Sequence, residues 1–187
     1  FASLIFLGLE RDRPVARAEL QALLFPDKGP RAAAHDLRQL LYRLRSIGAP
    51  VVAEARGIVV PPDRVRDDFS ALRRGGPVDA QIAKAVASGV MPGYAPTFSR
   101  PFSLWVEEQR TRIAQDLIRG LVARLTELRS AGRWPDLEPI ATACLALDPL
   151  NEEATLALAE SLALNGQKAR AVQILDTYIE DVGPYGK

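Results

Sequence analysis

Residues 31–46 carry the side chains whose types and spacing could bind a nucleic acid. At about 100° per residue, the angle between neighbours on an α-helix, this segment separates into an apolar and a polar face. The apolar face holds Ala33, Leu37, Leu40, Leu41 and Leu44. The opposite face holds Arg31, His35, Arg38, Gln39, Tyr42 and Arg45, with Arg43 on its flank. Each of these polar side chains can donate to phosphate oxygens or base edges, and arginine can fork onto guanine.

A basic helix face is more often merely solvated than functional, so other features must support DNA binding. All four basic residues of the segment are arginine, although a solvated face would accept lysine equally well. Arg56, beside Gly57, adds a candidate phosphate contact. Two residues of the polar face each allow two interpretations. His35 could contact a phosphate or be only solvated, and Tyr42 could reach DNA or lie over neighbouring aliphatic side chains.

The residue types do not indicate catalysis, metal binding or cofactor binding. A single His and a single Cys exclude a multi-histidine metal site, a cysteine-rich zinc site and a disulfide within the chain. Glu107 and Glu108 are neighbours, so on a helix they point about 100° apart and cannot share one substrate. No GxxxxGK or GxGxxG loop is present. We therefore expect no enzyme, no metal and no cofactor, and we expect Trp105, Trp134 and Cys144 to be packing residues.

The elements before and after residues 31–46 would position this polar face. Residues 1–9 are predicted as an apolar core helix, 16–25 as a second helix and 30–46 as a third, opened by Pro30. Two β-branched runs, 51–52 and 58–60, flank residues 53–57 and predict a hairpin. Three helices followed by a hairpin are typical of a winged helix, whose third helix recognises DNA.

The second part of the chain is predicted to be helical. Short helices are expected at 66–73 and 79–88, an ordered connector at 89–101, and nearly continuous helix from 102 with breaks at Gly132, Pro149, Gly166 and Gly183. Gly132 and Gly166 lie 34 residues apart, as do Pro149 and Gly183, which is the tetratricopeptide period. The pattern predicts antiparallel pairs of 102–131 with 135–147 and of 151–165 with 168–182. Since two units are few for such an array, its exposed end is expected to dock on the winged helix, on residues 66–101 or on a second chain.

Composition sets broad limits on the class of protein. The 187 residues are 48% hydrophobic and 25% charged, as expected for a soluble globular chain of one or two domains. The net charge is only +1, and residues 1–65 carry 10 basic and 7 acidic residues, so bulk charge alone does not indicate nucleic-acid binding. No apolar run approaches the roughly 20 residues needed to cross a bilayer, and the first residues lack the basic start of a signal peptide. We therefore expect a cytoplasmic protein with no membrane partner.

Several motifs, in their order along the chain, resemble one bacterial family. Segments 18–27 (AELQALLFPD) and 32–45 (AAAHDLRQLLYRLR) are similar to the winged helix of the Streptomyces antibiotic regulatory proteins, with Phe25 in place of the usual Trp. The following segments are similar to the bacterial transcriptional activator domain of those regulators: 65–69 (VRDDF), 89–93 (GVMPG), 102–110 (FSLWVEEQR) and 146–153 (ALDPLNEE).

The resemblance implies a mainly α chain with two domains. Residues 1–64 would form a winged-helix DNA-binding domain, N-terminally incomplete because the family's small leading sheet is missing, and residues 65–187 a bacterial transcriptional activator domain with tetratricopeptide-like helical hairpins. The implied function is sequence-specific transcription regulation, with helix 30–46 in the major groove of double-stranded DNA. The repeats would contact a second subunit in a homodimer, other domains of the full-length regulator, or RNA polymerase. The alternative is a protein-interaction scaffold whose winged helix no longer binds DNA.

Overall fold

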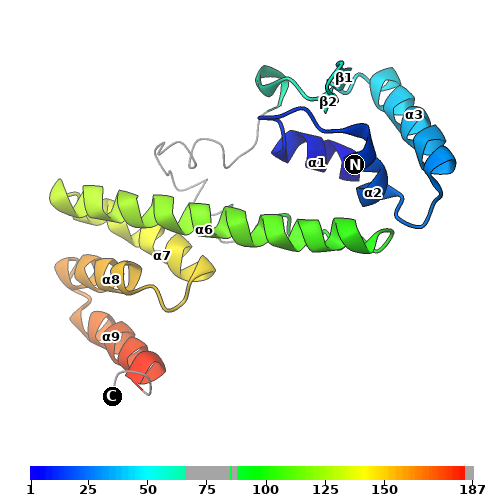
Figure 1. The fold of residues 1–187 in the computed structure, drawn as a ribbon. Helices are drawn as coiled ribbons and strands as arrows, with labels where there is room; N and C mark the ends of the chain where they lie inside the picture. The colour runs from blue at the N-terminus through cyan, green and yellow to red at the C-terminus, as the bar shows by residue number, and fades with distance from the viewer. Residues whose placement is uncertain (66–84, 86–87, 184–187) are drawn as a thin grey trace. The chain divides into compact units, whose positions relative to one another are not determined.

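The computed structural model describes residues 1–65, 85 and 88–183, and these residues are mainly helical, as the sequence predicts (Figure 1). Of the two short helices predicted at 66–73 and 79–88, only Ala85 and Ser88 fall within the described residues. The chain divides into two compact units, each built from two stretches: Phe1–Asp67 with Tyr94–Glu108, and Asp68–Gly93 with Gln109–Lys187. We call them unit 1 and unit 2. The domain boundary at residues 64 and 65 stays a prediction.

Unit 1 contains the predicted helices and hairpin within one or two residues of their expected bounds. Its elements are α1 (Ala2–Leu9), α2 (Arg17–Leu24), α3 (Pro30–Ser46), β1 (Val52–Ala53), β2 (Ile58–Val59) and the 3-10 turn η1 (Pro62–Arg64). Phe6 and Leu7 of α1 are buried, which confirms the interpretation of residues 1–9 as a core helix. Helices α2 and α3 pack against each other.

A small sheet joins the hairpin to the chain before α2. β1 and β2 are antiparallel, with Val52 opposite Val59 and Ala53 opposite Ile58. On its other side Ile58 pairs with Val15: the Val15 amide donates to the Ile58 carbonyl at 2.9 Å, and the Ile58 amide donates back at 2.8 Å. The neighbouring Gly57 lies so close that a Cβ there would be 2.4 Å from the Val15 carbonyl oxygen. Only glycine fits this crossing without moving the backbone.

The apolar face of α3 supplies part of the core of unit 1. Ala33, Leu37, Leu41 and Leu44 are buried, together with Leu20 and Leu24 of α2. Leu40, which the sequence also places on this face, is only half-buried because it lies at the edge of the apolar arc. The opposite, polar face is thereby fixed towards solvent.

Residues 94–108 complete the core of unit 1, although they follow the hairpin by more than thirty residues. Phe102 has no exposed surface, and its ring stacks on Trp105 at 5.5 Å, while Trp105 also contacts the Phe6 ring of α1 at 4.7 Å. The packing role expected of Trp105 is confirmed. Ser99 precedes α6 (Arg100–Ser130); its hydroxyl oxygen accepts from the Phe102 amide at 3.3 Å and donates to the Leu23 carbonyl at 2.6 Å. One buried hydroxyl thus caps α6 and holds the end of α2.

Among its described residues, unit 2 contains the rest of α6, a 3-10 turn and three helices at the predicted places. These are η2 (Trp134–Asp136), α7 (Leu137–Leu147), α8 (Glu152–Leu164) and α9 (Lys168–Val182). The chain turns at Gly132 and Gly166, whose φ angles of +66° and +81° favour glycine. α7 packs on α8 and α8 on α9, which confirms the expected pairing of 151–165 with 168–182 (Figure 1). The pairing of 102–131 with 135–147 and the tetratricopeptide-like arrangement stay predictions.

Unit 2 includes a turn at residues 89–93 to which Arg110 donates two hydrogen bonds. Arg110 of α6 donates from Nε to the Val90 carbonyl at 3.1 Å and from Nη2 to the Met91 carbonyl at 2.8 Å. Met91 lies in the left-handed region, with a φ of +51°, between glycines that also have positive φ. Two segments that the sequence marks as motifs, 89–93 and 102–110, are therefore in direct contact.

Among the helices of the described residues, none is both long enough and apolar enough to cross a bilayer.

Candidate nucleic-acid interface

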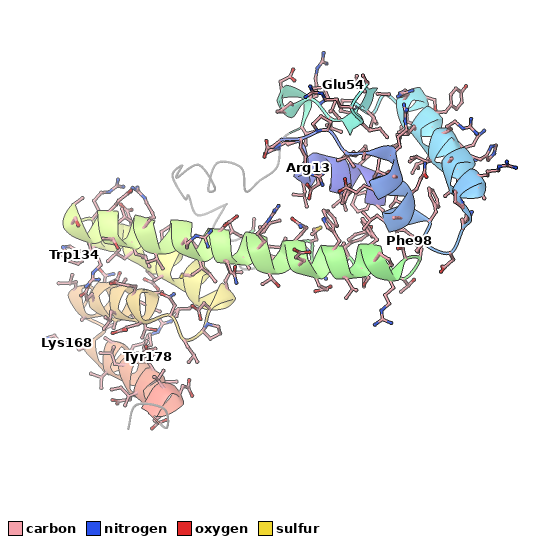
Figure 2. The ribbon with its side chains drawn as sticks, viewed as in Figure 1. Arg13, Glu54, Phe98, Trp134, Lys168 and Tyr178 are labelled. Carbon is pink, nitrogen blue, oxygen red and sulfur yellow. The ribbon has the colours of Figure 1, made fainter. Side chains whose placement is uncertain are left out.

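α3 presents its polar face because its first residue and its apolar stripe determine its orientation. Pro30 begins the helix after Gly29, whose extended backbone leads the chain in, and a proline at the first position loses no helical hydrogen bond. The helix of 17 residues is about 25 Å long at 1.5 Å per residue. All seven predicted side chains of this face are exposed: Arg31, His35, Arg38, Gln39, Tyr42, Arg43 and Arg45. Figure 2 shows side chains tipped with nitrogen projecting from α3 away from α1 and α2.

Three acids of unit 1, Glu10, Glu19 and Asp36, form ion pairs with basic residues outside the polar face. Arg13 forks onto Glu19 with bonds of 2.9 and 2.5 Å and reaches Glu10 at 2.9 Å. Its hydrogen bonds to the Glu19 carboxylate raise the pKa of the Arg13 guanidinium above its usual range. Asp36, the acid of α3 itself, is paired with Lys28, which lowers the pKa of the Asp36 carboxyl below its usual range.

The arginines of the polar face are not neutralised in this way. The guanidinium groups of Arg31, Arg38 and Arg43 have no hydrogen bond or ion pair to any residue that the structure describes. Because Asp36, the one acid of α3, is paired with Lys28, none of these three guanidinium groups is paired with an acid of its own helix. An arrangement of unpaired, closely spaced cations is what a polyanion such as a nucleic-acid backbone would meet.

A groove of about 700 Å³ runs along one side of α3, and most of the arginines of the polar face line it. Arg31, Arg38 and Arg45 line it from α3, and Arg17 lines it from the start of α2. Its other lining residues are Gln21, Ala34, Leu37, Leu41, Tyr42 and Ala53. Arg17 is missing from the site that the sequence predicts. Arg17 lies only about 20° from the buried Leu24 on the wheel of α2, so spacing within α2 does not single it out.

The other side of α3 carries a smaller hollow of about 470 Å³. His35, Gln39 and Arg43 line it, together with Phe25, Asp36 and Leu40. The predicted residues of α3 therefore fall on both flanks of one exposed ridge. Tyr42 is 71% exposed, so most of its ring faces solvent rather than neighbouring aliphatic side chains.

Arg45 and Arg56 differ from the other predicted residues in their contacts and position. Arg45 donates from Nε to the Val51 carbonyl at 3.3 Å, which ties the end of α3 to the chain entering β1. Arg56 lies in the turn between β1 and β2, which is closed by the Glu54 amide donating to the Gly57 carbonyl at 2.7 Å. Arg56 is exposed and lines neither hollow; Figure 2 labels the neighbouring Glu54 on this hairpin.

Away from α3, the single cysteine is found in a packing position. Cys144 of α7 is fully buried, as expected, and this burial raises the pKa of its thiol to about 11. Within the part of the chain that the structure describes, no three or more His, Cys, Asp or Glu side chains are grouped so that they could hold a metal ion.

The comparison with protein families identifies the helical part of the chain. The family model of the bacterial transcriptional activator domain matches residues 71–180, which is more than half of the 187 residues. The chain is thus of a class found in bacterial transcription regulation, and it belongs to the bacterial transcriptional activator domain family. The comparison with curated proteins gives no match. The family match begins after the hairpin, so α3 and its polar face lie outside it.

Proposed function

We propose that this protein is a sequence-specific DNA-binding transcriptional regulator, with α3 in the major groove of double-stranded DNA. The observation that carries the proposal is the set of arginines on the exposed face of α3 whose guanidinium groups have no partner among the described residues, on a helix whose one acid, Asp36, is paired with Lys28. The family match over residues 71–180 supports the same role, because this family is the bacterial transcriptional activator domain. The regulator would be cytoplasmic and would perform no catalysis of its own.

The order of elements in unit 1 supports a winged helix of the kind found in the Streptomyces antibiotic regulatory proteins. A helix is followed by a short strand-like residue, Val15, then by two packed helices and a two-stranded hairpin whose inner strand pairs with Val15. In a winged helix, the third helix enters the major groove and the hairpin lies beside it. Arg56, at the turn of the hairpin, is then the candidate for a phosphate contact outside the groove.

The two flanks of α3 suggest separate roles for its side chains. Arg31 and Arg38, together with Arg17 of α2, would contact phosphates or fork onto guanine from the larger groove. Gln39 and Arg43, on the other flank, would reach base edges or the facing strand, and His35 a phosphate. Arg45 would act chiefly by holding β1 in place through its bond to the Val51 carbonyl.

The helical repeats of unit 2 would serve protein contacts. Tetratricopeptide-like hairpins present surfaces between stacked helices, and α7, α8 and α9 pack in succession. Their partner would be a second subunit, another domain of the full-length regulator, or RNA polymerase. A protein-interaction scaffold that does not bind DNA remains the competing function, and it would leave the arginines of α3 with no ligand.

A gel-shift experiment with random genomic fragments separates these two functions. The regulator should retain a subset of fragments, whereas the scaffold should retain none. With a retained fragment, Arg38→Ala should lower affinity by roughly 5- to 100-fold if Arg38 forks onto guanine. Arg112→Ala is the matched control, because Arg112 is an exposed arginine of α6 in unit 2 with no partner among the described residues. Equal affinity of the two variants would contradict the proposed role of α3.

A further inference from the structure

A groove of about 410 Å³ lies within unit 2, between α9 and the end of α7. Leu145 of α7 and Pro149, which follows that helix, line one side of it, and Thr155 lines it from α8. Figure 2 labels Tyr178, one of the lining residues of α9. The residues that line it from α9 are Arg170, Gln173, Ile174, Thr177, Tyr178 and Asp181.

Four of these residues form a line along α9. Arg170, Ile174, Thr177 and Asp181 follow one another at intervals of four, three and four residues, which keeps them within about 60° on the helical wheel. Arg170 and Asp181 differ by only about 20° on this wheel, and they lie about 16 Å apart along the axis at 1.5 Å per residue. A base and an acid therefore mark the two ends of one line that faces the groove.

Both charges are available to a ligand. Nη1 of Arg170 contacts the Gln167 side chain at 3.4 Å, which is longer than the usual hydrogen bond. The Asp181 carboxylate has no hydrogen bond or ion pair to any residue that the structure describes. Since about 16 Å exceeds the distance of about 8–10 Å over which salt screens exposed charges, the two groups do not neutralise each other.

The side chains between the two charges suit an extended chain. The Gln173 and Thr177 side chains are exposed, and the Thr177 hydroxyl oxygen can accept a hydrogen bond while it donates to the Gln173 main-chain carbonyl. A helical partner uses its own backbone N–H and C=O groups internally, whereas an extended chain has free ones to offer. Ile174 and Tyr178, which are half-buried, provide apolar contact beside these polar groups.

We propose that this groove binds an extended peptide segment of a partner protein, with an acidic and a basic residue about five positions apart and apolar residues between them. The acid would pair with Arg170 and the base with Asp181, because an extended chain advances about 3.3 Å per residue and covers the distance in about five. The apolar residues would lie against Ile174 and Tyr178. The proposal rests on the role in protein contacts proposed for unit 2, and it does not depend on DNA binding by α3.

Selection from a random peptide library tests the groove. Displayed peptides of about 12 residues, which can span the groove when extended, are selected on the full chain without added DNA. The enriched peptides should share an acidic and a basic residue about four to six positions apart. The most enriched one is then synthesised with a fluorophore, and its dissociation constant is measured by fluorescence anisotropy.

Charge reversal at either end of the groove should weaken binding of this peptide. Arg170→Glu and Asp181→Lys should each raise the dissociation constant roughly tenfold, because an attractive pair becomes a repulsive one. Lys168→Glu is the matched control. It makes the same change of charge at an exposed residue of α9, about 160° around the helix from Arg170, and should leave the constant within about threefold of the parent.

Charge exchange tests the pairing itself. The double variant Arg170→Glu with Asp181→Lys should prefer a peptide whose acidic and basic residues are exchanged, whereas the parent should prefer the original peptide. Circular dichroism shows whether the variants keep their helices. A library with no enriched charge pattern, equal binding by the Arg170→Glu and Lys168→Glu variants, or a double variant with the preference of the parent would overturn the proposal.

Failure of the groove can be told apart from failure of the proposed function. Enriched peptides that bind all these variants equally would overturn the groove and leave protein contacts by unit 2 standing. The gel-shift experiment reports on α3 separately, and there Arg170→Glu should bind DNA like the parent.

Discussion

Replacing Gly57 by alanine should separate the hairpin from the chain that leads into α2. The added Cβ would lie 2.4 Å from the Val15 carbonyl oxygen and 2.8 Å from the Val15 carbonyl carbon. Ordinary contact requires a retreat of about 1 Å, since non-bonded heavy atoms rest near 3.5 Å. The Val15–Ile58 hydrogen bonds of 2.9 and 2.8 Å would then stretch beyond the bonding range. Losing both at about 0.5–1.5 kcal/mol each, with about 1–3 kcal/mol of overpacking, predicts a loss of about 2–6 kcal/mol in the free energy of unfolding of unit 1.

Urea unfolding followed by fluorescence measures this loss. In a Trp134→Phe background, Trp105 is the remaining tryptophan and reports on unit 1. Gly8→Ala is the matched control, because Gly8 lies inside α1 and a Cβ there meets only Val65 at an ordinary 3.8 Å. That variant should be neutral or more stable by up to about 1 kcal/mol, since alanine favours helix. A Gly57→Ala variant as stable as the parent would refute the close approach of the two backbones.

Three further substitutions or treatments test other contacts. Ser99→Ala should lower the free energy of unfolding, measured in a urea titration, by about 2–3 kcal/mol, because it removes the cap of α6 and leaves the Leu23 carbonyl unpaired. A loss under about 0.5 kcal/mol would show that this hydroxyl does not join α6 to α2. Arg110→Lys should cost about 1–3 kcal/mol by the same measurement, since one ammonium cannot reproduce the fork onto two carbonyls, whereas Arg112→Ala should change little. The Cys144 thiol, with its pKa raised to about 11, should react with iodoacetamide at about pH 8 at least 100-fold more slowly in the folded chain than in urea. Its rate should rise about tenfold per pH unit until near pH 11, and a native rate equal to the unfolded one would contradict its burial.

Much of unit 1 could be predicted because its signals are local. The helix over residues 30–46 follows from the spacing of its leucines, and the same spacing places its arginines on the exposed face. A helical wheel has limited angular resolution, however. It does not separate Leu40, which lies at the edge of the apolar arc and is half-buried, from the fully buried leucines. It also gives no information on partners outside the helix, so it places Arg45 on the polar face without its bond to the Val51 carbonyl.

The remaining features depend on contacts between distant residues. Val15 forms a single-residue bridge, which is too short to show any periodicity in the sequence. Phe102 and Trp105 read as packing residues of a helix, but the alternation of apolar residues cannot say that they pack with α1, about a hundred residues earlier. Arg17 joins the groove only because α2 and α3 pack side by side. Local sequence patterns therefore predict the helices and strands, whereas contacts between distant residues determine which of these elements share a core or a groove.

The salt dependence of DNA binding tests the central claim most directly. The slope of log K against log salt counts the phosphates that a protein neutralises, at about 0.9 per phosphate on a duplex. The triple variant Arg31→Ala, Arg38→Ala and Arg43→Ala removes three exposed, unpaired cations, each at a cost of no more than about 0.5 kcal/mol in stability. If all three meet phosphates, the slope should flatten by close to 3 relative to the parent, while Arg112→Ala should leave it unchanged. A triple variant that folds normally and binds DNA with the affinity and slope of the parent would contradict the account, and so would a parent chain that binds no DNA.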